Sequence, residues 1–112
     1  MTTVFGRIIR GELPCTKVFE NERILAIEDI HPVAPVHVLI MPKKEIPNLQ
    51  SVESHDLPLI AEMIEVAQKI AAERGIADGY RLLTNNGPRG GQLIFHLHFH
   101  LIGGKQLGSK IA

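Results

Sequence analysis

The sequence predicts an α+β domain with a mostly antiparallel sheet and with one long and one short helix packed on one face. Short segments rich in branched apolar residues alternate with brief turns, which is typical of strands joined as hairpins. The segment 57–74 repeats its apolar residues with a helical period and makes the main crossover. The length of 112 residues and the hydrophobic content of 45% suit a single domain, residues 1–112, with a short polar tail at 105–112.

The first half of the chain predicts a short helix followed by three strands. Apolar residues at 4, 5, 8 and 9 have the spacing of an amphipathic helix over 4–10, and Gly11 suits its C-cap. Residues 17–20 and 24–28 are typical of two strands joined by a turn. Branched residues predict a third strand at 36–41.

The second half predicts the long helix and then two strands on either side of a glycine-rich loop. Ser54 can cap the long helix, and Gly75 stands where a left-handed cap would end it. Strands are expected at 80–84 and 93–102. The loop between them, 85–92, reads NNGPRGGQ and is incompatible with regular structure.

Composition excludes several classes of function. The formal net charge is zero, which argues against a nucleic acid or a membrane surface as partner. We find no signal-peptide core and no apolar stretch near the ~20 residues of a membrane span. Cys15 is the single cysteine, so neither an internal disulfide nor a multi-cysteine zinc site can form. We therefore expect a soluble cytoplasmic protein.

Three histidines alternate with apolar residues in HLHFHLIGG, residues 96–104. On a strand, His96, His98 and His100 share one face, while the apolar residues between them pack under the helix. Imidazole is the side chain most often used near neutral pH for proton transfer, nucleophilic attack and metal binding. The pattern therefore predicts a functional site on the face that the histidines share.

Zinc is one candidate ligand for these histidines. The Cα atoms of His96 and His100 would lie ~13 Å apart on a strand, which is too far for both rings to bind one ion easily at ~2.1 Å. Two of the three histidines together with His37 could still bind zinc. We favour a site without metal, because of the loop that precedes the histidines.

The glycine-rich loop favours a phosphate group as ligand. Gly90 and Gly91 could bring bare backbone N–H groups close to an anion. Asn85 and Gln92 add side-chain amide donors. A loop of this kind running directly into three aligned histidines indicates a phosphate held against an imidazole.

At this point the sequence resembles a known family. HLHFHLIGG resembles the histidine triad (HIT) signature, in which three histidines alternate with apolar residues. More closely, the chain resembles the branch of histidine triad nucleotide-binding proteins (Hint). Besides the triad, three segments match in order: FGRIIRGELP at 5–14, AIEDIHPVAPVHVLIMPKK at 26–44 and GYRLLTNNGPRGGQ at 79–92.

The resemblance implies a HIT-like fold and a homodimer in which the sheet continues from one subunit to the other. It implies a purine nucleotide as partner, and an enzyme that hydrolyses a substituent from the α-phosphate of AMP or GMP derivatives. Phosphoramidates and acyl-adenylates are the implied substrates, a nucleotidyl-histidine is the implied intermediate, and neither metal nor cofactor is required. The implied activity is that of a nucleoside phosphoramidase.

The resemblance also implies roles for individual residues. His98 corresponds to the nucleophile, His100 to the residue that contacts the phosphate and leaving group, and His96 and His37 to a supporting relay. Asp29 and Ile30 correspond to the ribose and base-edge positions. The implied phosphate contacts are Asn85, Gly91 and Gln92, and the implied base pocket is formed by Phe5, Ile8, Leu13, Ile27 and Leu39.

Two departures from the branch affect the leaving group. Leu93 stands where the branch often has serine, which removes a hydroxyl, and the tail KQLGSKIA contains no tryptophan. His31 is expected to face solvent. Two other functions stay open on the sequence alone: a dinucleoside polyphosphate hydrolase, and a nucleotide-binding interaction module whose hydrolysis is incidental.

Overall fold

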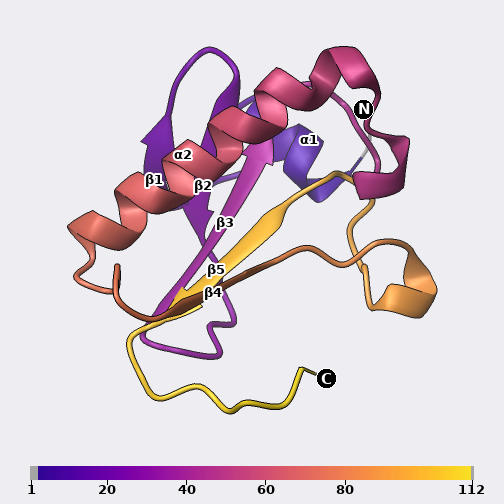
Figure 1. The fold of residues 1–112 in the computed structure, drawn as a ribbon. Coiled ribbons are helices and arrows are strands. Elements are labelled where there is room, and N and C mark those ends of the chain that lie inside the picture. The colour runs from indigo at the N-terminus through magenta and orange to yellow at the C-terminus, as the bar shows by residue number, and fades with distance from the viewer. Residues whose placement is uncertain (1–2, 112) are drawn as a thin grey trace.

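The chain folds around one five-stranded sheet in a computed structural model that describes residues 3–111 (Figure 1). Residues 1, 2 and 112 of the predicted domain lie outside the described residues. The strand order is β1-β2-β3-β5-β4, and every neighbouring pair is antiparallel. The predicted α+β class is therefore confirmed. The strands are β1 (Lys17–Glu20), β2 (Ile24–Glu28), β3 (Val36–Pro42), β4 (Tyr80–Leu83) and β5 (Phe99–Gly103).

Two α-helices form where the sequence predicts them. The helix α1 covers Val4–Ile9, and the Thr3 hydroxyl accepts a hydrogen bond from the Gly6 amide at its start. The helix α2 covers Leu57–Glu73. Ser54 does not cap it; Ser54–Asp56 form a 3₁₀ turn instead, closed by a reciprocal capping box between Glu53 and Asp56. Further 3₁₀ turns lie at Leu49–Ser51 and Pro88–Gly90.

The two helices cover opposite faces of the sheet, so the expectation of both on one face is wrong (Figure 1). Ile24 and Ala26 of β2 pack in the core beneath α2, whereas Leu25 and Ile27 pack with Phe5 of α1. The cause is the unbroken apolar character of β2 and β3, because strands that are apolar on both sides need cover on both sides.

The last strand is shorter than expected: β5 begins at Phe99 and not at Leu93. Ladder pairing with β3 reaches only Ile40 opposite Phe99. Before that point the backbone groups find other partners. The Leu97 amide donates to the Ile46 carbonyl, and the His98 carbonyl accepts from the Thr84 hydroxyl. The alternation nevertheless persists, since Leu97, Phe99 and Leu101 lie in the core beneath α2 as predicted.

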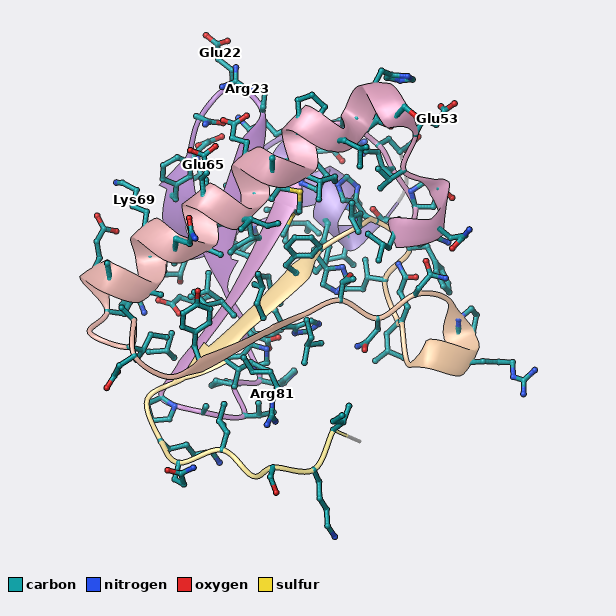
Figure 2. All side chains as sticks on the ribbon, in the orientation of Figure 1. Glu22, Arg23, Glu53, Glu65, Lys69 and Arg81 are labelled. Carbon is teal, nitrogen blue, oxygen red and sulfur yellow. The ribbon has the colours of Figure 1, made fainter. Side chains whose placement is uncertain are left out.

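The chain leaves β5 through Gly103 and Gly104 and then runs without regular structure. The backbone of Gly104 has φ +92°, and a Cβ there would lie 3.0 Å from the Cβ of Pro35. Figure 2 shows Arg81 beside the C-terminal segment, where its guanidinium donates to the Gly108 carbonyl. Among residues 3–111, neither α-helix has the length and apolar character that crossing a bilayer requires.

We predict that Gly104→Ala lowers the free energy of unfolding by about 1–3 kcal/mol, because alanine disfavours a positive φ and its methyl group would press on Pro35. Urea denaturation measures the effect. Gly108→Ala is the matched control, since its added methyl group meets nothing within 4 Å. Equal stability of Gly104→Ala and Gly108→Ala would contradict this account of Gly104.

Candidate active site

The histidines line a cavity of about 450 Å³ on the sheet face opposite α2. Its walls are α1, the end of β2, the middle of β3 and the loop that precedes β5. The cavity brings together most of the residues that the sequence assigns to a site. Those that line it are Phe5, Ile8, Ile27, Asp29, Ile30, Leu39, Asn85, Gly91, Gln92, His98 and His100.

His98 is held at the cavity by a hydrogen bond to backbone. Its Nδ1 lies 2.7 Å from the His96 carbonyl oxygen, which can only accept, so Nδ1 carries the proton. The other ring nitrogen, Nε2, is then unprotonated in the neutral imidazole. Phe5 packs edge-on against the ring, with 4.8 Å between the ring centroids. The acceptor that fixes the tautomer of His98 is thus a backbone carbonyl two residues before it.

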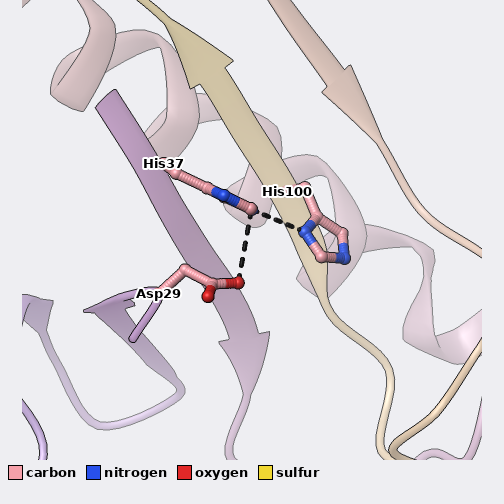
Figure 3. A group of neighbouring side chains, drawn as sticks. All are labelled: Asp29, His37 and His100. Atoms are coloured by element: carbon pink, nitrogen blue, oxygen red, sulfur yellow. Dashed lines mark hydrogen bonds and ion pairs between the residues drawn. The ribbon is translucent and has the colours of Figure 1, made fainter. Parts of the chain in front are cut away.

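His37 and His100 form a directly bonded pair across β3 and β5 (Figure 3). His100 is opposite Leu39 in the ladder, so His37 is its diagonal neighbour on the same face. The His37 Nε2 lies 2.9 Å from the His100 Nδ1. The Val33 amide donates to the His37 Nδ1 at 3.1 Å, which leaves the proton of a neutral His37 on Nε2.

The direction of this bond determines which nitrogen of His100 can act on a ligand. Because the His37 Nε2 donates, the His100 Nδ1 accepts, and a neutral His100 carries its proton on Nε2. His100 lines the cavity, so Nε2–H is its available donor. Asp29 completes the group: its Oδ2 lies 3.3 Å from the His37 Nε2.

His96 lies apart from the other three histidines. Its ring is fully buried, and its Nε2 lies 2.7 Å from the Pro42 carbonyl, to which it donates. Its Nδ1 has no hydrogen-bond partner in the part of the chain that the structure describes. The ring ties the end of β3 to the segment before β5, and the carbonyl of the same residue orients His98.

Burial keeps the triad histidines neutral. It lowers the pKa of His96 and of His98, in each case as the largest influence. The pKa of His100 falls to about 4, first through burial and then through the neighbouring His98 and His37, although Asp29 opposes the change. At neutral pH the cavity therefore presents neutral imidazoles, one of them with a free lone pair.

The glycine-rich loop differs from the expectation of bare backbone donors. The amides of Gly90 and Gly91 already donate to the carbonyls of Gly87 and Pro88, because Pro88–Gly90 forms a 3₁₀ turn. The side chain of Gln92 is buried and also bonded within the protein, to the Gly87 amide and to the carbonyls of Pro47 and Ile94.

Gln92 therefore shapes the loop, and the side-chain amide that remains at the cavity is that of Asn85. Asn85 lies beside Gly91, whose backbone is left-handed at φ +90°. A loop of this shape can still offer an anion the Asn85 amide next to the imidazoles of His98 and His100.

Three predicted residues do not line the cavity: His37, His96 and Leu13. The two histidines lie behind it, and Leu13 is half-buried elsewhere. Five further residues line the cavity: Val4, Glu28, His31, Leu93 and Ile94. Leu93 was expected to affect the leaving group and His31 to face solvent, whereas sequence reasoning missed the other three. The signal for Val4 is its place beside Phe5 on α1, and Glu28 and His31 flank positions that were predicted. Ile94 was hidden by the strand expected over 93–102, which begins only at Phe99.

The zinc alternative fits the geometry poorly. The ligand atoms of Asp29, His37 and His100 lie within 4.8 Å of one another. However, the His37 Nε2 carries a proton that it donates to the His100 Nδ1 at 2.9 Å, so neither of these two nitrogens offers an ion a free lone pair. Glu53, His55 and Asp56 form a second cluster of possible metal ligands. The Asp56 carboxylate there already forms an ion pair with the Lys44 ammonium.

Comparison with known proteins finds similarity to one family. The family described as HIT domain matches residues 10–107. A HIT-like protein of Chlamydia pneumoniae is 55% identical over 107 residues, which cover 96% of this chain and 97% of that protein. The structure of a HIT family hydrolase from Clostridium thermocellum is 47% identical, with a TM-score of 0.96, and the match covers 99% of this chain and 97% of the other.

A hypothetical histidine triad nucleotide-binding protein from Sulfolobus tokodaii is also similar in structure. It is 41% identical, and the match has a TM-score of 0.77. The matched region covers 88% of this chain and 66% of that one.

We predict that the protein loses stability between pH 7 and pH 5. Unfolded histidines take up protons near pH 6.5, whereas the folded His100 does so only near pH 4. Protons therefore favour the unfolded chain in this window, which lies above the window in which paired carboxylates such as Glu20 lose their stabilising charge. Urea denaturation at successive pH values measures the slope. His100→Asn should flatten it; a slope equal to that of the wild type would refute the assignment.

Proposed function

The chain belongs to the HIT domain family and has the fold of its hydrolases, and on this basis we propose that it is a nucleoside phosphoramidase. The proposed substrates are AMP or GMP derivatives with a substituent on the α-phosphate, such as phosphoramidates and acyl-adenylates. One observation carries the proposal: the His98 Nδ1–H bonded to the His96 carbonyl, which leaves the Nε2 lone pair for a ligand. We place the activity in the cytoplasm, on the sequence grounds given above.

His98 makes the first bond in the proposed mechanism. Its Nε2 lone pair forms a bond to phosphorus while the bond from phosphorus to the substituent breaks, and the bonding electrons leave with the substituent, which takes up a proton. The modified imidazole becomes positively charged. The His96 carbonyl supports that charge, because a hydrogen bond strengthens when its donor becomes cationic.

Water completes the cycle. Its oxygen forms a bond to phosphorus, the bond between nitrogen and phosphorus breaks, and the electron pair returns to the His98 Nε2. The water loses a proton, and the nucleoside monophosphate is released. The Nδ1–H of His98 keeps its carbonyl partner throughout, so the same ring is ready for the next substrate.

His100 and Asn85 are the donors proposed for the phosphate. The His100 Nε2–H and the Asn85 amide are both at the cavity, where charge on the phosphate oxygens is least screened by water. A bound phosphate anion also favours the protonated form of His100, in the direction opposite to burial. His100 is thereby suited to assist the departing substituent.

The apolar end of the cavity supports a purine as the group that binds there. Phe5, Ile8, Ile27 and Leu39 line it from both α1 and the sheet, and such walls suit a flat aromatic base. Asp29 also lines the cavity, beside the His37–His100 pair, where its carboxylate can accept hydrogen bonds from ribose hydroxyls. The wall thus offers an apolar surface for a base, a carboxylate for a sugar and imidazoles for a phosphate.

A homodimer is part of the proposal. Within residues 3–111, β4 is an edge strand that pairs only with β5, and Tyr80 at its start is an exposed aromatic. The charged residue of β4, Arg81, donates to the Gly108 carbonyl, whereas the other edge strand, β1, carries the exposed charges of Lys17 and Glu20. Charge discourages pairing between sheet edges, so β4 is the edge suited to continue the sheet into a second subunit.

We predict that His98 carries a nucleotidyl group during turnover. Mass spectrometry of protein trapped within one turnover of adenosine 5′-phosphoramidate should find the adduct on the peptide that contains His98. His98→Ala should reduce turnover by at least about 10³-fold, because the nucleophile is gone, and should leave the fold intact. Turnover equal to that of the wild type would reject the catalytic function and leave an interaction module.

We predict a mass near twice 12.4 kDa in analytical ultracentrifugation. Tyr80→Lys should shift the equilibrium toward the monomer by placing a charge at the β4 edge. The matched control is Lys17→Glu at the β1 edge, which should not change the mass. A wild-type monomer, or an equal response of both variants, would count against the β4 interface.

A further inference from the structure

Asp29 lines the cavity and also contacts His37, the partner of His100 in the bonded histidine pair. We propose that Asp29 is a positioning residue for the chemical step: its carboxylate holds His37 in the tautomer that makes His100 present Nε2–H to the phosphate. This role is distinct from a grip on ribose, and it rests on the proposed function of the cavity. One carboxylate would then both bind the ribose hydroxyls and fix which nitrogen of His37 carries the proton.

The carboxylate is fixed in place before any ligand binds. Asp29 follows β2, and its amide donates to the His37 carbonyl at 3.0 Å, so the two backbones are tied together. Its Oδ1 accepts from the His31 amide at 2.7 Å, which fixes the side chain in a local turn. Its Oδ2 then lies 3.3 Å from the His37 Nε2 (Figure 3). The side chain is only 18% exposed.

Two independent groups favour the same tautomer of His37. The Val33 amide can only donate, so it needs a lone pair on the His37 Nδ1. The Asp29 carboxylate can only accept, so it needs a proton on the His37 Nε2. With the proton on Nδ1, two N–H groups would face each other at one nitrogen, and the carboxylate would face a lone pair at the other.

The tautomer of His37 determines the tautomer of His100 through the hydrogen bond between the two rings. The His37 Nε2–H donates to the His100 Nδ1, which occupies the Nδ1 lone pair of His100. The Asp29 carboxylate lies 3.3 Å from the same His37 nitrogen and favours the proton there by its negative charge. The proton of His100 is then on Nε2, at the cavity. The charged and titratable groups that face this pair are Asp29 beyond β2 and His98 before β5.

The same carboxylate remains available to the substrate. Each of its oxygens has more than one acceptor position, so ribose hydroxyls can bind without displacing His31 or His37. Asp29 can therefore contact the ribose and His37 at the same time. It follows that removing the charge of Asp29 should affect the chemical step even for a substrate that has no ribose hydroxyls.

The first test examines the free protein by ¹⁵N NMR of the imidazoles. In the wild type, His37 should carry its proton on Nε2, and His100 should show an accepting Nδ1. In Asp29→Asn, a single oxygen cannot serve both His31 and His37, and the amide N–H₂ opposes the proton on one of them. The Nε2–H population of His37 should fall. Asp78→Asn, an exposed surface change, is the matched control and should leave it unchanged.

The second test measures turnover of adenosine 5′-phosphoramidate and of its 2′,3′-dideoxy analogue. Asp29→Asn should lower kcat about 10- to 100-fold on both substrates, as a misaligned catalytic group does. If Asp29 acts through the ribose alone, the variant and the wild type will have equal kcat on the dideoxy substrate, and the proposal is overturned.

The two tests separate this proposal from the proposed function. Absence of phosphoramidate turnover would reject the function, while the NMR measurement would still decide the role of Asp29. If Asp29→Asn does not fold, the wild-type spectrum still tests the premise, because a proton on the His37 Nδ1 would overturn the proposal. An unchanged His37 tautomer in a folded Asp29→Asn would also overturn it.

Discussion

The antiparallel pairing of β3 with β5 is the constraint on which the site depends. It makes His37 and His100 diagonal neighbours on one face, close enough for a direct hydrogen bond between their rings. A one-residue slip in this register would turn one of the two imidazoles into the core beneath α2. The slip is opposed by the apolar residues on the other side of β5, Phe99 and Leu101, which are buried there.

The histidine that matters most for the proposed chemistry lies where this pairing has stopped. Residues 96–98 have no strand partner, and a fully buried imidazole, that of His96, holds them to the end of β3 through Pro42. Within residues 3–111 the arrangement leaves the buried His96 Nδ1 without a hydrogen-bond partner, a cost of about 1–3 kcal/mol. In return, the His96 carbonyl is free of the ladder and can orient His98.

The sequence predicts the elements well, because their apolar periods are strong, and it predicts most of the cavity wall through the triad and the family resemblance. It does not predict partners that are distant in the chain. The Pro42 carbonyl is 54 residues from His96, and His37 is 63 residues from His100. Nor does it reveal that the amides of Gly90 and Gly91 are used within a 3₁₀ turn, because a glycine-rich sequence permits both open and closed loops.

The central strand has a consequence for how the protein fails on heating. β3 is bonded to β2 on one side and to β5 on the other, and all seven of its residues are buried. Segments of this kind open only when the whole molecule unfolds. His37, which β3 carries, therefore keeps its position until the whole protein melts. Activity that depends on His37 should then be lost in the same thermal transition as the native fold.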